Sequence, residues 1–349
     1  MTEFSAGQVS TARLVLTREQ ILAFRRRTNE LDERLPPGPG SLRRAAWCGL
    51  QDSMPRAALL SVHARVAGVG PSAWEDPALV QLWGPRFSVF VVPARDHAVF
   101  SLGLLPDDVK GRRRAEDLAA RLAAAVGGDR VRYDVAARRA GIHPAFKVRY
   151  TSATGTVLIR WEGARQPVVR AVPPPEGEPD AARRELLRRY LHVYGPAAAA
   201  SFAAWSGISA RSCAAAFTAL GAALTPVRTP LGDAWILAED EAAVRAAPGA
   251  AAPARLLPSG DAYFLLQGAD RELLVPGTAR RGALWTPRVW PGALVVGGEV
   301  AGTWRRAGPV VKVQTWRALT GAERDAVAAE AESLPLPGLS RRITVSWDE

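Results

Sequence analysis

The most constraining feature of the sequence is an order of elements that occurs twice. Apolar residues recur at helical spacing over 114–126, 133–142 and 143–153, and two alternating segments, 155–163 and 166–172, follow around a glycine turn. After a proline-rich linker at 172–179 the order returns, with helices over 180–195, 196–208 and 209–224 and a hairpin over 225–238. Three helices followed by a two-stranded hairpin are typical of a winged helix. The sequence therefore predicts two such units in tandem.

The regions before and after these repeats differ from each other. Thr17 and Gln20 form a capping-box pattern that predicts a helix over 17–35, ended by the proline- and glycine-rich residues 36–40. Beyond residue 260, alternating segments with glycine turns predict a mainly β region, followed by a helix over 320–334 and a strand over 341–347. The expected fold class is α+β, made of tandem winged-helix units and a β-rich, winged-helix-like C-terminal unit. The expected domains are 1–172, 180–247 and 253–349.

The charge of the chain favours a polyanionic partner. It has 45 basic and 34 acidic residues, a net charge of +11, and all but three of the basic residues are arginine. Guanidinium groups suit phosphates and bases, so double-stranded DNA is the expected partner. Any single basic doublet is more often a solvated surface than a contact. The predicted DNA contacts are Arg56, Arg138, Arg139, Arg305 and Arg306.

Several classes of chemistry lack a sequence signal. Cys48 and Cys213 lie far apart, and the four histidines show no metal-ligand spacing. A phosphate-binding loop and a serine-nucleophile motif are also missing, so no metal and no cofactor are expected. The N-terminus does not resemble a signal peptide, and no apolar run has membrane-spanning length. We expect a cytoplasmic protein, at the nucleoid, with no membrane partner.

The stretch 47–66 raises a choice between two interpretations. Its apolar residues recur at helical spacing, but Gln51, Asp52 and Ser53 stand together just after Gly49. Such residues commonly cap a helix N-terminus. The same three side chains could also bind a water molecule by hydrogen bonds. Sequence pattern alone favours the helix cap.

Three passages resemble the AlkZ-type winged-helix DNA glycosylases, bacterial proteins that excise alkylated purines, bulky adducts and interstrand crosslinks. "GLQDSMPRAALLSVHARV" is similar to the family signature "LQ-x-Q-D-P-R-x-A-L-x-x-x-x-R". "ELLRRYLHVYGPAAAASFAAWSGI" is similar to the second winged helix, and "ARLLPSGDAYFLLQGADRELL" with "VVGGEVAGTWRR" to the C-terminal unit. The signature is matched at Leu50, Gln51, Pro55, Arg56, Ala58, Leu59 and Arg65.

The resemblance implies that Gln51, Asp52 and Ser53 are catalytic. The family motif is Gln, an apolar residue, then Gln or Asp; here the middle position is acidic, the third is a hydroxyl, and Met54 replaces the usual Asp. A 7-alkylated guanine is already cationic and leaves without a protonating acid. The site then has to place a water molecule and stabilise oxocarbenium character at the sugar. Gln51 is expected to orient the water, and either Asp52 or Ser53 to accept its proton.

The expected function is therefore a monofunctional, monomeric DNA N-glycosylase. Its substrates would be bulky, cationic 7-alkylguanine adducts or crosslinks in duplex DNA, and protection against a self-made alkylating compound is one expected role. The alternative is a non-catalytic winged-helix regulator or adduct sensor. Such a protein would read DNA sequence and commonly carry a dimer or ligand module, for which the sequence shows no heptad run.

Overall fold

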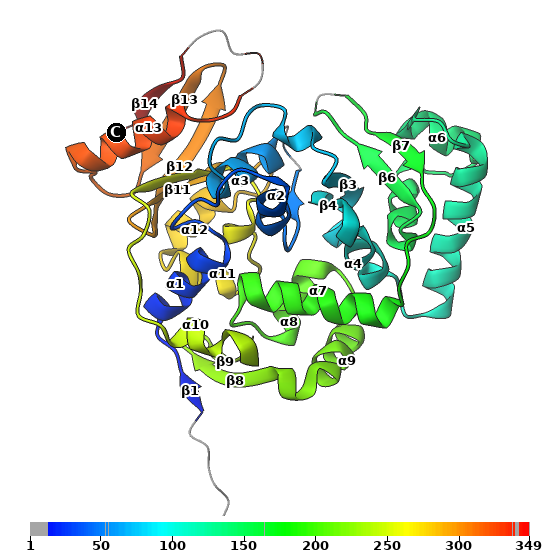
Figure 1. Cartoon of the computed structure of the whole chain (residues 1–349), viewed down its shortest axis with the longest axis horizontal. Helices are drawn as coiled ribbons and strands as arrows, with labels where there is room; N and C mark the ends of the chain where they lie inside the picture. Colours follow the sequence, from blue (N-terminus) through cyan, green and yellow to red (C-terminus); the bar gives the residue numbers. More distant parts are fainter. Residues whose placement is uncertain are drawn as a thin grey trace, which may run out of the picture.

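Three β-sheets organise the computed structural model, with strand orders β1-β8-β9, β2-β4-β3-β6-β7-β5 and β10-β11-β12-β13-β14 (Figure 1). The structure describes residues 13–52, 54, 56–163, 165–336, 338 and 342–348. The predicted α+β class is confirmed by these sheets and the helices between them. Within the described ranges, no helix has both the length and the apolar character needed to cross a membrane.

The N-terminal helix α1 (Arg18–Thr28) begins as predicted and ends earlier. The Thr17 side chain accepts a hydrogen bond from the Gln20 N–H, and the Gln20 side chain accepts one from the Thr17 N–H. The predicted end at residue 35 is wrong. The Asn29 amide donates to the carbonyl oxygens of Arg25 and of Val193, a residue distant in sequence, at 2.8 and 3.1 Å. The helix itself ends in a Schellman-type cap, in which Glu30 has φ +55°, its N–H donates to the Arg27 carbonyl and the Leu31 N–H donates to the Arg26 carbonyl.

The stretch 47–66 is not one helix. It begins with strand β2 (Leu50–Gln51), which pairs antiparallel with β4 (Val89–Pro93), and only then enters α3 (Ala57–Arg65). Gly49 precedes the strand at φ +76°, and a Cβ there would lie 3.0 Å from the Phe90 ring. Glycine thus allows the chain to pass close to β4, and the strand sets the direction of the residues that follow.

The first predicted repeat has the expected order of elements. The segment 145–154 is a 3₁₀ helix, and the other two helices are α-helical. Strands β6 and β7 pair antiparallel, and β6 also pairs with β3 (Leu79–Trp83), so this hairpin extends the sheet that holds β2. The elements are α5 (Val109–Val126), β5 (Val131–Arg132), α6 (Tyr133–Arg139), η5 (Ala145–Thr154), β6 (Val157–Arg160) and β7 (Val168–Ala171).

The second repeat also has three helices and an antiparallel hairpin. Its first strand β8 also pairs in parallel with β1 (Leu14–Val15), so the N-terminal residues contribute to this sheet. The elements are α7 (Pro179–Tyr194), α8 (Ala199–Ser206), α9 (Ala210–Leu220), β8 (Leu224–Thr229) and β9 (Gly232–Leu237).

The C-terminal region is β-rich, but its first part is helical. The alternation predicted over 261–290 is wrong, because this segment holds η8 (Ala262–Phe264), α11 (Asp270–Leu274) and α12 (Thr278–Leu284). Their apolar residues, such as Phe264 and Leu284, are buried in the main core. The remaining elements are β10 (Ala254–Leu257), β11 (Gly292–Val296), β12 (Glu299–Ala307), β13 (Val310–Thr315), α13 (Gly321–Glu332) and β14 (Thr344–Asp348).

Short elements complete the chain. They are α2 (Pro39–Ala45), η1 (Ala73–Glu75), η2 (Pro85–Phe87), η3 (Ala94–Asp96), α4 (His97–Ser101), η4 (Leu102–Leu104), η6 (Gly221–Ala223), η7 (Ala238–Asp240) and α10 (Glu241–Arg245).

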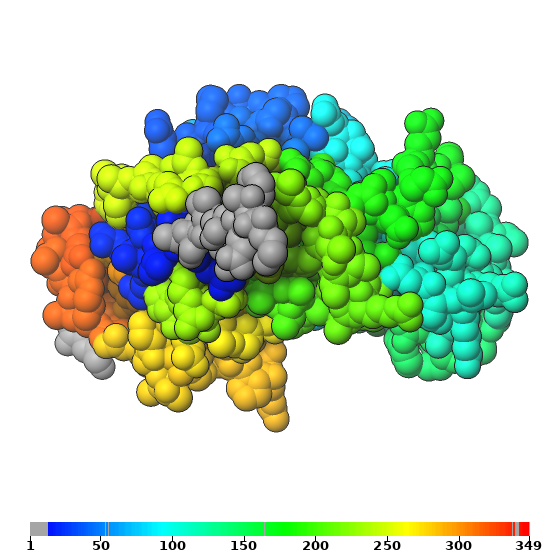
Figure 2. Space-filling view, turned by 90° about the horizontal axis from the view of Figure 1, so that it is seen from below, coloured from blue at the N-terminus to red at the C-terminus, as the bar shows by residue number. Residues whose placement is uncertain are grey.

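One core connects distant parts of the sequence. Its buried residues include Leu22 on α1, Phe90 on β4, Tyr190 on α7 and Leu257 on β10. Figures 1 and 2 show the C-terminal sheet and the α5–α6 region at opposite ends of an elongated molecule. In Figure 1, α3 and β4 lie between these two ends.

Candidate functional site

Gln51 lies where the N-terminal and C-terminal parts of the chain meet. It is half-buried on β2 and is paired with Phe90 of β4. Its side chain lies against the loop after β10, where a Cβ on Gly260 would be 3.2 Å from Gln51 Nε2. Gly260 also has φ +75°, a conformation that favours glycine. This contact could not be predicted from residue patterns, because it joins residues more than 200 positions apart.

Asp52 is buried and accepts hydrogen bonds on both carboxylate oxygens. Oδ1 accepts from the Ala58 N–H at 3.0 Å, in the first turn of α3, and Oδ2 accepts from Gln81 Nε2 at 2.8 Å. The Asp52 N–H donates to the Val89 carbonyl of β4 at 2.7 Å. The carboxylate therefore bonds to a helix N-terminus, as the capping interpretation expects, and Asp52 directly follows Gln51 in the chain.

The environment of Asp52 makes its carboxyl a proton acceptor near neutral pH. Burial raises the pKa of Asp52 to about 6, opposed by the hydrogen bonds from Ala58 and Gln81 and by the charge of Arg56. A carboxyl with this pKa is mostly ionised at pH 7 yet binds protons more tightly than a solvated one. Such a pKa suits general-base work.

Gln81 fixes the polarity of a short hydrogen-bond chain. Its Nε2 donates to Asp52, and its Oε1 accepts from the Trp161 N–H at 2.7 Å. The amide cannot be turned over without placing two acceptors against each other at the Asp52 end and two donors against each other at the Trp161 end. Gln81 was not predicted as a site residue. The available signal was a polar residue inside the apolar strand segment 79–83, since such buried polar groups need partners.

Two residues of the predicted motif, Ser53 and Pro55, lie outside the described residues. Arg56 follows at φ +65° and places its guanidinium 3.7 Å from the centre of the Trp74 ring. Arg160 of β6 lies 3.4 Å from the same ring. The charge of Arg56 also lowers the pKa of Asp52, so Arg56 is close to the candidate site. Arg160, which shares the Trp74 ring with Arg56, was not selected by sequence reasoning.

The structure separates the other predicted DNA contacts from this site. Arg138 and Arg139 are exposed on α6, where Arg138 lies 3.4 Å from Asp134, and Arg305 and Arg306 are exposed on β12. Figure 1 shows α6 and β12 at opposite ends of the molecule. A ligand that contacts all of them has to be long.

The histidines do not form a catalytic or metal cluster. Burial lowers the pKa of His63 to about 3, and His192 pairs with Asp240 at 2.9 Å. Across the described part of the chain, no three His, Cys, Asp or Glu residues are grouped so that they could hold a metal ion. Both cysteines are free and buried.

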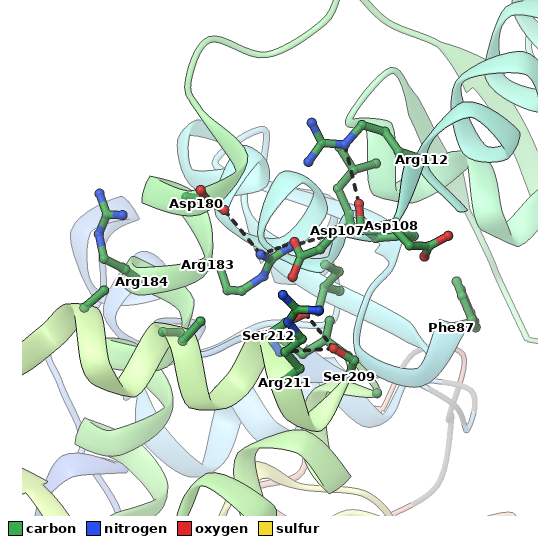
Figure 3. Close-up of a pocket in the computed structure, with 18 residues that line it drawn as sticks. Phe87, Asp107, Asp108, Arg112, Asp180, Arg183, Arg184, Ser209, Arg211 and Ser212 are labelled. Atoms are coloured by element: carbon green, nitrogen blue, oxygen red, sulfur yellow. Dashed lines mark hydrogen bonds and ion pairs between the residues drawn. The ribbon is translucent and has the colours of Figure 1, made fainter. Parts of the chain in front are cut away.

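A groove of about 870 Å³ lies between the first turns of α5 and α7 and helix α9 (Figure 3). In its wall the buried Arg183 pairs with Asp107 and Asp180 and donates to two backbone carbonyls. Arg184 and Arg211 also line the groove and add positive charge. Its lining comes from separate segments of the sequence, so residue patterns did not predict it.

A buried ion pair connects α3 to the loop that contacts Gln51. Both oxygens of Asp261 accept hydrogen bonds from Arg65, at 2.7 and 2.8 Å, and both side chains are at most 2 % exposed. Ser61 donates to Asp261 at 2.6 Å, and Arg65 also donates to Asn29. This network places the Gly260 backbone against Gln51.

Asp261→Ala should lower the free energy of unfolding by about 3–5 kcal/mol, because it leaves the Arg65 charge buried and unpaired. Urea denaturation measures this loss. Asp233→Ala is the matched control: Asp233 pairs with Arg13 and Arg228 at the surface, so its loss should cost less than about 1 kcal/mol. Equal effects of the two substitutions would contradict the structural role of the buried pair.

Comparison with known proteins gives a consistent result. The family model described as "DNA glycosylase AlkZ-like" matches residues 44–335. Among solved structures, Streptomyces sahachiroi DNA glycosylase AlkZ is similar, with a TM-score of 0.80 and 19% sequence identity over 96% of this chain and 100% of that one. At this identity the likeness shows a shared fold. None of the curated proteins matches the chain by sequence.

Proposed function

Because the chain belongs to the AlkZ-like DNA glycosylase family, we propose that it hydrolyses the N-glycosidic bond of cationic 7-alkylguanines in duplex DNA, including bulky adducts and crosslinks. The observation that carries this proposal is the ionisable, buried carboxylate of Asp52 beside Gln51, inside the matched region. The product of such a monofunctional enzyme is an abasic site and a free base.

In the proposed mechanism, the lesion supplies its own positive charge and departs as a neutral base. The Gln51 amide orients a water molecule toward C1′ of the sugar as the glycosidic bond breaks. Asp52, with a pKa of about 6, is mostly ionised at pH 7, accepts the proton of that water and stabilises the oxocarbenium character. In this proposal Ser53 is the other candidate for activating the water.

The same reasoning defines which substrates are poor. A neutral leaving base such as uracil or hypoxanthine needs a proton donor, and an ionised Asp52 accepts protons rather than donating them. Release of uracil or hypoxanthine from duplex DNA at pH 7 should therefore be far slower than release of a 7-alkylguanine.

The proposed fold assignment explains how DNA is held. We assign an N-terminal helical region and the first winged helix to 1–172, the second winged helix to 180–247 and a β-rich, winged-helix-like unit to 253–349. The exposed arginines on α6 and β12 lie far apart along the molecule, which suits contacts to a duplex. We propose a monomer that acts on chromosomal DNA in the cytoplasm, with protection against a self-made alkylating compound as one role.

Incubation with alkylated plasmid, followed by alkali to cleave abasic sites, tests the proposed activity. The proposed enzyme produces strand breaks only when the plasmid has been alkylated. A protein that binds the alkylated plasmid and produces no abasic sites would instead be the non-catalytic regulator or adduct sensor.

DNA binding should be strongly salt-dependent and weakly sequence-dependent. If about five phosphates are neutralised, the slope of log affinity against log salt is near −4 to −5. Arg305→Ala with Arg306→Ala should weaken binding uniformly across sequences and reduce the magnitude of this slope. Fluorescence anisotropy at several salt concentrations measures both effects. An unchanged affinity between low and high salt, or a loss confined to one sequence, would contradict the proposed phosphate contacts.

A further inference from the structure

A second cavity, of about 320 Å³, adjoins the candidate site. It lies between the β3–β4 turn, η5 and the segment between β6 and β7. Three of its lining residues are aromatic, and an amide and a guanidinium in the lining are hydrogen-bond donors. The residues that matter here are Trp83, Phe87, Val89, Arg149, Trp161 and Gln166.

Two hydrogen-bond connections join this cavity to Asp52. The Asp52 N–H donates to the carbonyl of Val89, which lines the cavity. The Asp52 carboxylate accepts from Gln81, and Gln81 in turn accepts from the N–H of Trp161, another lining residue. A group bound in the cavity would therefore lie close to the proposed water-activating residues.

The turn that presents Phe87 has an unusual backbone. Arg86 and Phe87 are consecutive non-glycine residues with φ of 54° and 56°, in the left-handed region. Conformations of this kind cost free energy and cluster at functional sites. Phe87 is 41% exposed, lines both this cavity and the groove of Figure 3, and packs edge-on against Tyr150 with the ring centres 4.8 Å apart.

We propose that this cavity receives the guanine ring of an adduct that is attached to one strand only, after that ring has rotated out of the duplex. This inference rests on the proposed function and names the part of the site that binds the substrate base. Flipped bases are held by stacking on aromatic side chains and by hydrogen bonds to their edges. Aromatic faces also attract cations, which favours a positively charged base over a neutral one. Gln166 and Arg149 provide donors for the guanine carbonyl oxygen.

Binding to three duplexes tests the proposal. One carries a single 7-methylguanine on a 2′-fluoro sugar, which slows base loss; the others carry an unmodified guanine or a tetrahydrofuran abasic analogue at that position. Wild type should bind the 7-methylguanine duplex more tightly than the abasic duplex. Phe87→Ala and Trp161→Ala should reduce this preference by roughly 5- to 150-fold, the usual effect of removing one stacked ring. Trp161→Ala retains the backbone N–H that bonds to Gln81.

Trp235→Ala is the matched control, because Trp235 is 39% exposed on β9 and does not line the cavity. It should leave the preference unchanged, and Phe87→Tyr should retain it. Three outcomes would overturn the proposal. Phe87→Ala could weaken binding to all three duplexes equally, Phe87→Ala could leave the preference for the 7-methylguanine duplex unchanged, or wild type could show no preference. A preference that depends on Phe87 without any base release would refute the glycosylase activity alone. Base release with an unaltered preference would refute the cavity alone.

Discussion

Gln51→Ala is expected to reduce the release of 7-alkylguanine by at least about 100-fold, while DNA affinity stays close to wild type. A single polar group that stabilises charge in a transition state is usually worth that much. The side chain is half-buried and lies against the backbone of Gly260, so truncation removes an amide without opening a large cavity. Single-turnover excision from an oligonucleotide with one adduct measures the effect.

Thermal melting and DNA anisotropy of the same Gln51→Ala protein provide the controls. Both should remain near the wild-type values. Gln51→Glu is a matched variant of the same size that replaces the amide with a carboxylate, and it should also lose activity. If Gln51→Ala melts much lower and stops binding DNA, Gln51 supports the fold and has no direct part in catalysis.

Asp52→Asn is expected to slow excision by about 10²–10⁴-fold, the usual range for a lost general base. This single variant has a second effect, because both partners of the carboxylate, the Ala58 N–H and the Gln81 amide, are donors. The NH2 group of the amide introduced at position 52 must face one of these two donors. The Gln81 amide cannot rotate to offer its oxygen instead, because that oxygen accepts a hydrogen bond from the Trp161 N–H. We therefore expect a stability loss of about 1–3 kcal/mol as well.

Combining Asp52→Asn with Gln81→Glu separates the two effects. The side-chain amide introduced at position 52 then donates to the carboxylate introduced at position 81. That carboxylate still accepts a hydrogen bond from the Trp161 N–H. The one hydrogen bond lost is the 3.4 Å bond from the Gln81 amide to the Trp161 carbonyl. Stability should largely recover and the total charge is unchanged. If Asp52 is the base, the double variant melts like wild type and remains about 10²–10⁴-fold slow.

If Asp52 only caps α3, the double variant should excise at nearly the wild-type rate. Ser53→Ala would then be the damaging substitution. In the account favoured here, Ser53→Ala costs less than Asp52→Asn, because a hydroxyl is a poor proton acceptor and mainly orients the water.

The pH dependence of excision should report on the same carboxyl. With the pKa of Asp52 near 6, the rate should be level above pH 6 and fall about tenfold per pH unit below it, as the base becomes protonated. Because the folded chain raises this pKa, protonation of Asp52 at low pH favours the folded state. The fall therefore reflects catalysis rather than unfolding caused by this group. A flat profile between pH 5 and 7 would contradict the role of Asp52.

The elements that were predicted best from the sequence are those that depend on local residue patterns. The capping box at Thr17 and the order of helices and hairpins after residue 108 follow from spacing and turn residues, and both are present. The predictions failed where distant contacts decide. The alternating segment 261–290 folds into helices packed in the core. The end of α1 was missed for a different reason, because it depends on Glu30 adopting the left-handed conformation that usually favours glycine.

The candidate site was predicted only in part for the same reason. Gln51 and Asp52 are adjacent in sequence, and their chemistry was visible there. Their partners Gln81, Trp161 and Gly260 lie 29 to about 210 positions away, so only the fold brings them together. The alternation between apolar and polar residues carries no information about such contacts.

The most direct test is to incubate a duplex that contains one 7-alkylguanine with excess protein at pH 7 and to identify the released molecule by mass spectrometry. Wild type should release the free alkylated base and leave an abasic strand that alkali cleaves, whereas Gln51→Ala, with intact DNA binding, should not. Binding of the duplex by wild type with no release of base, or equal release by wild type and Gln51→Ala, would contradict this expectation.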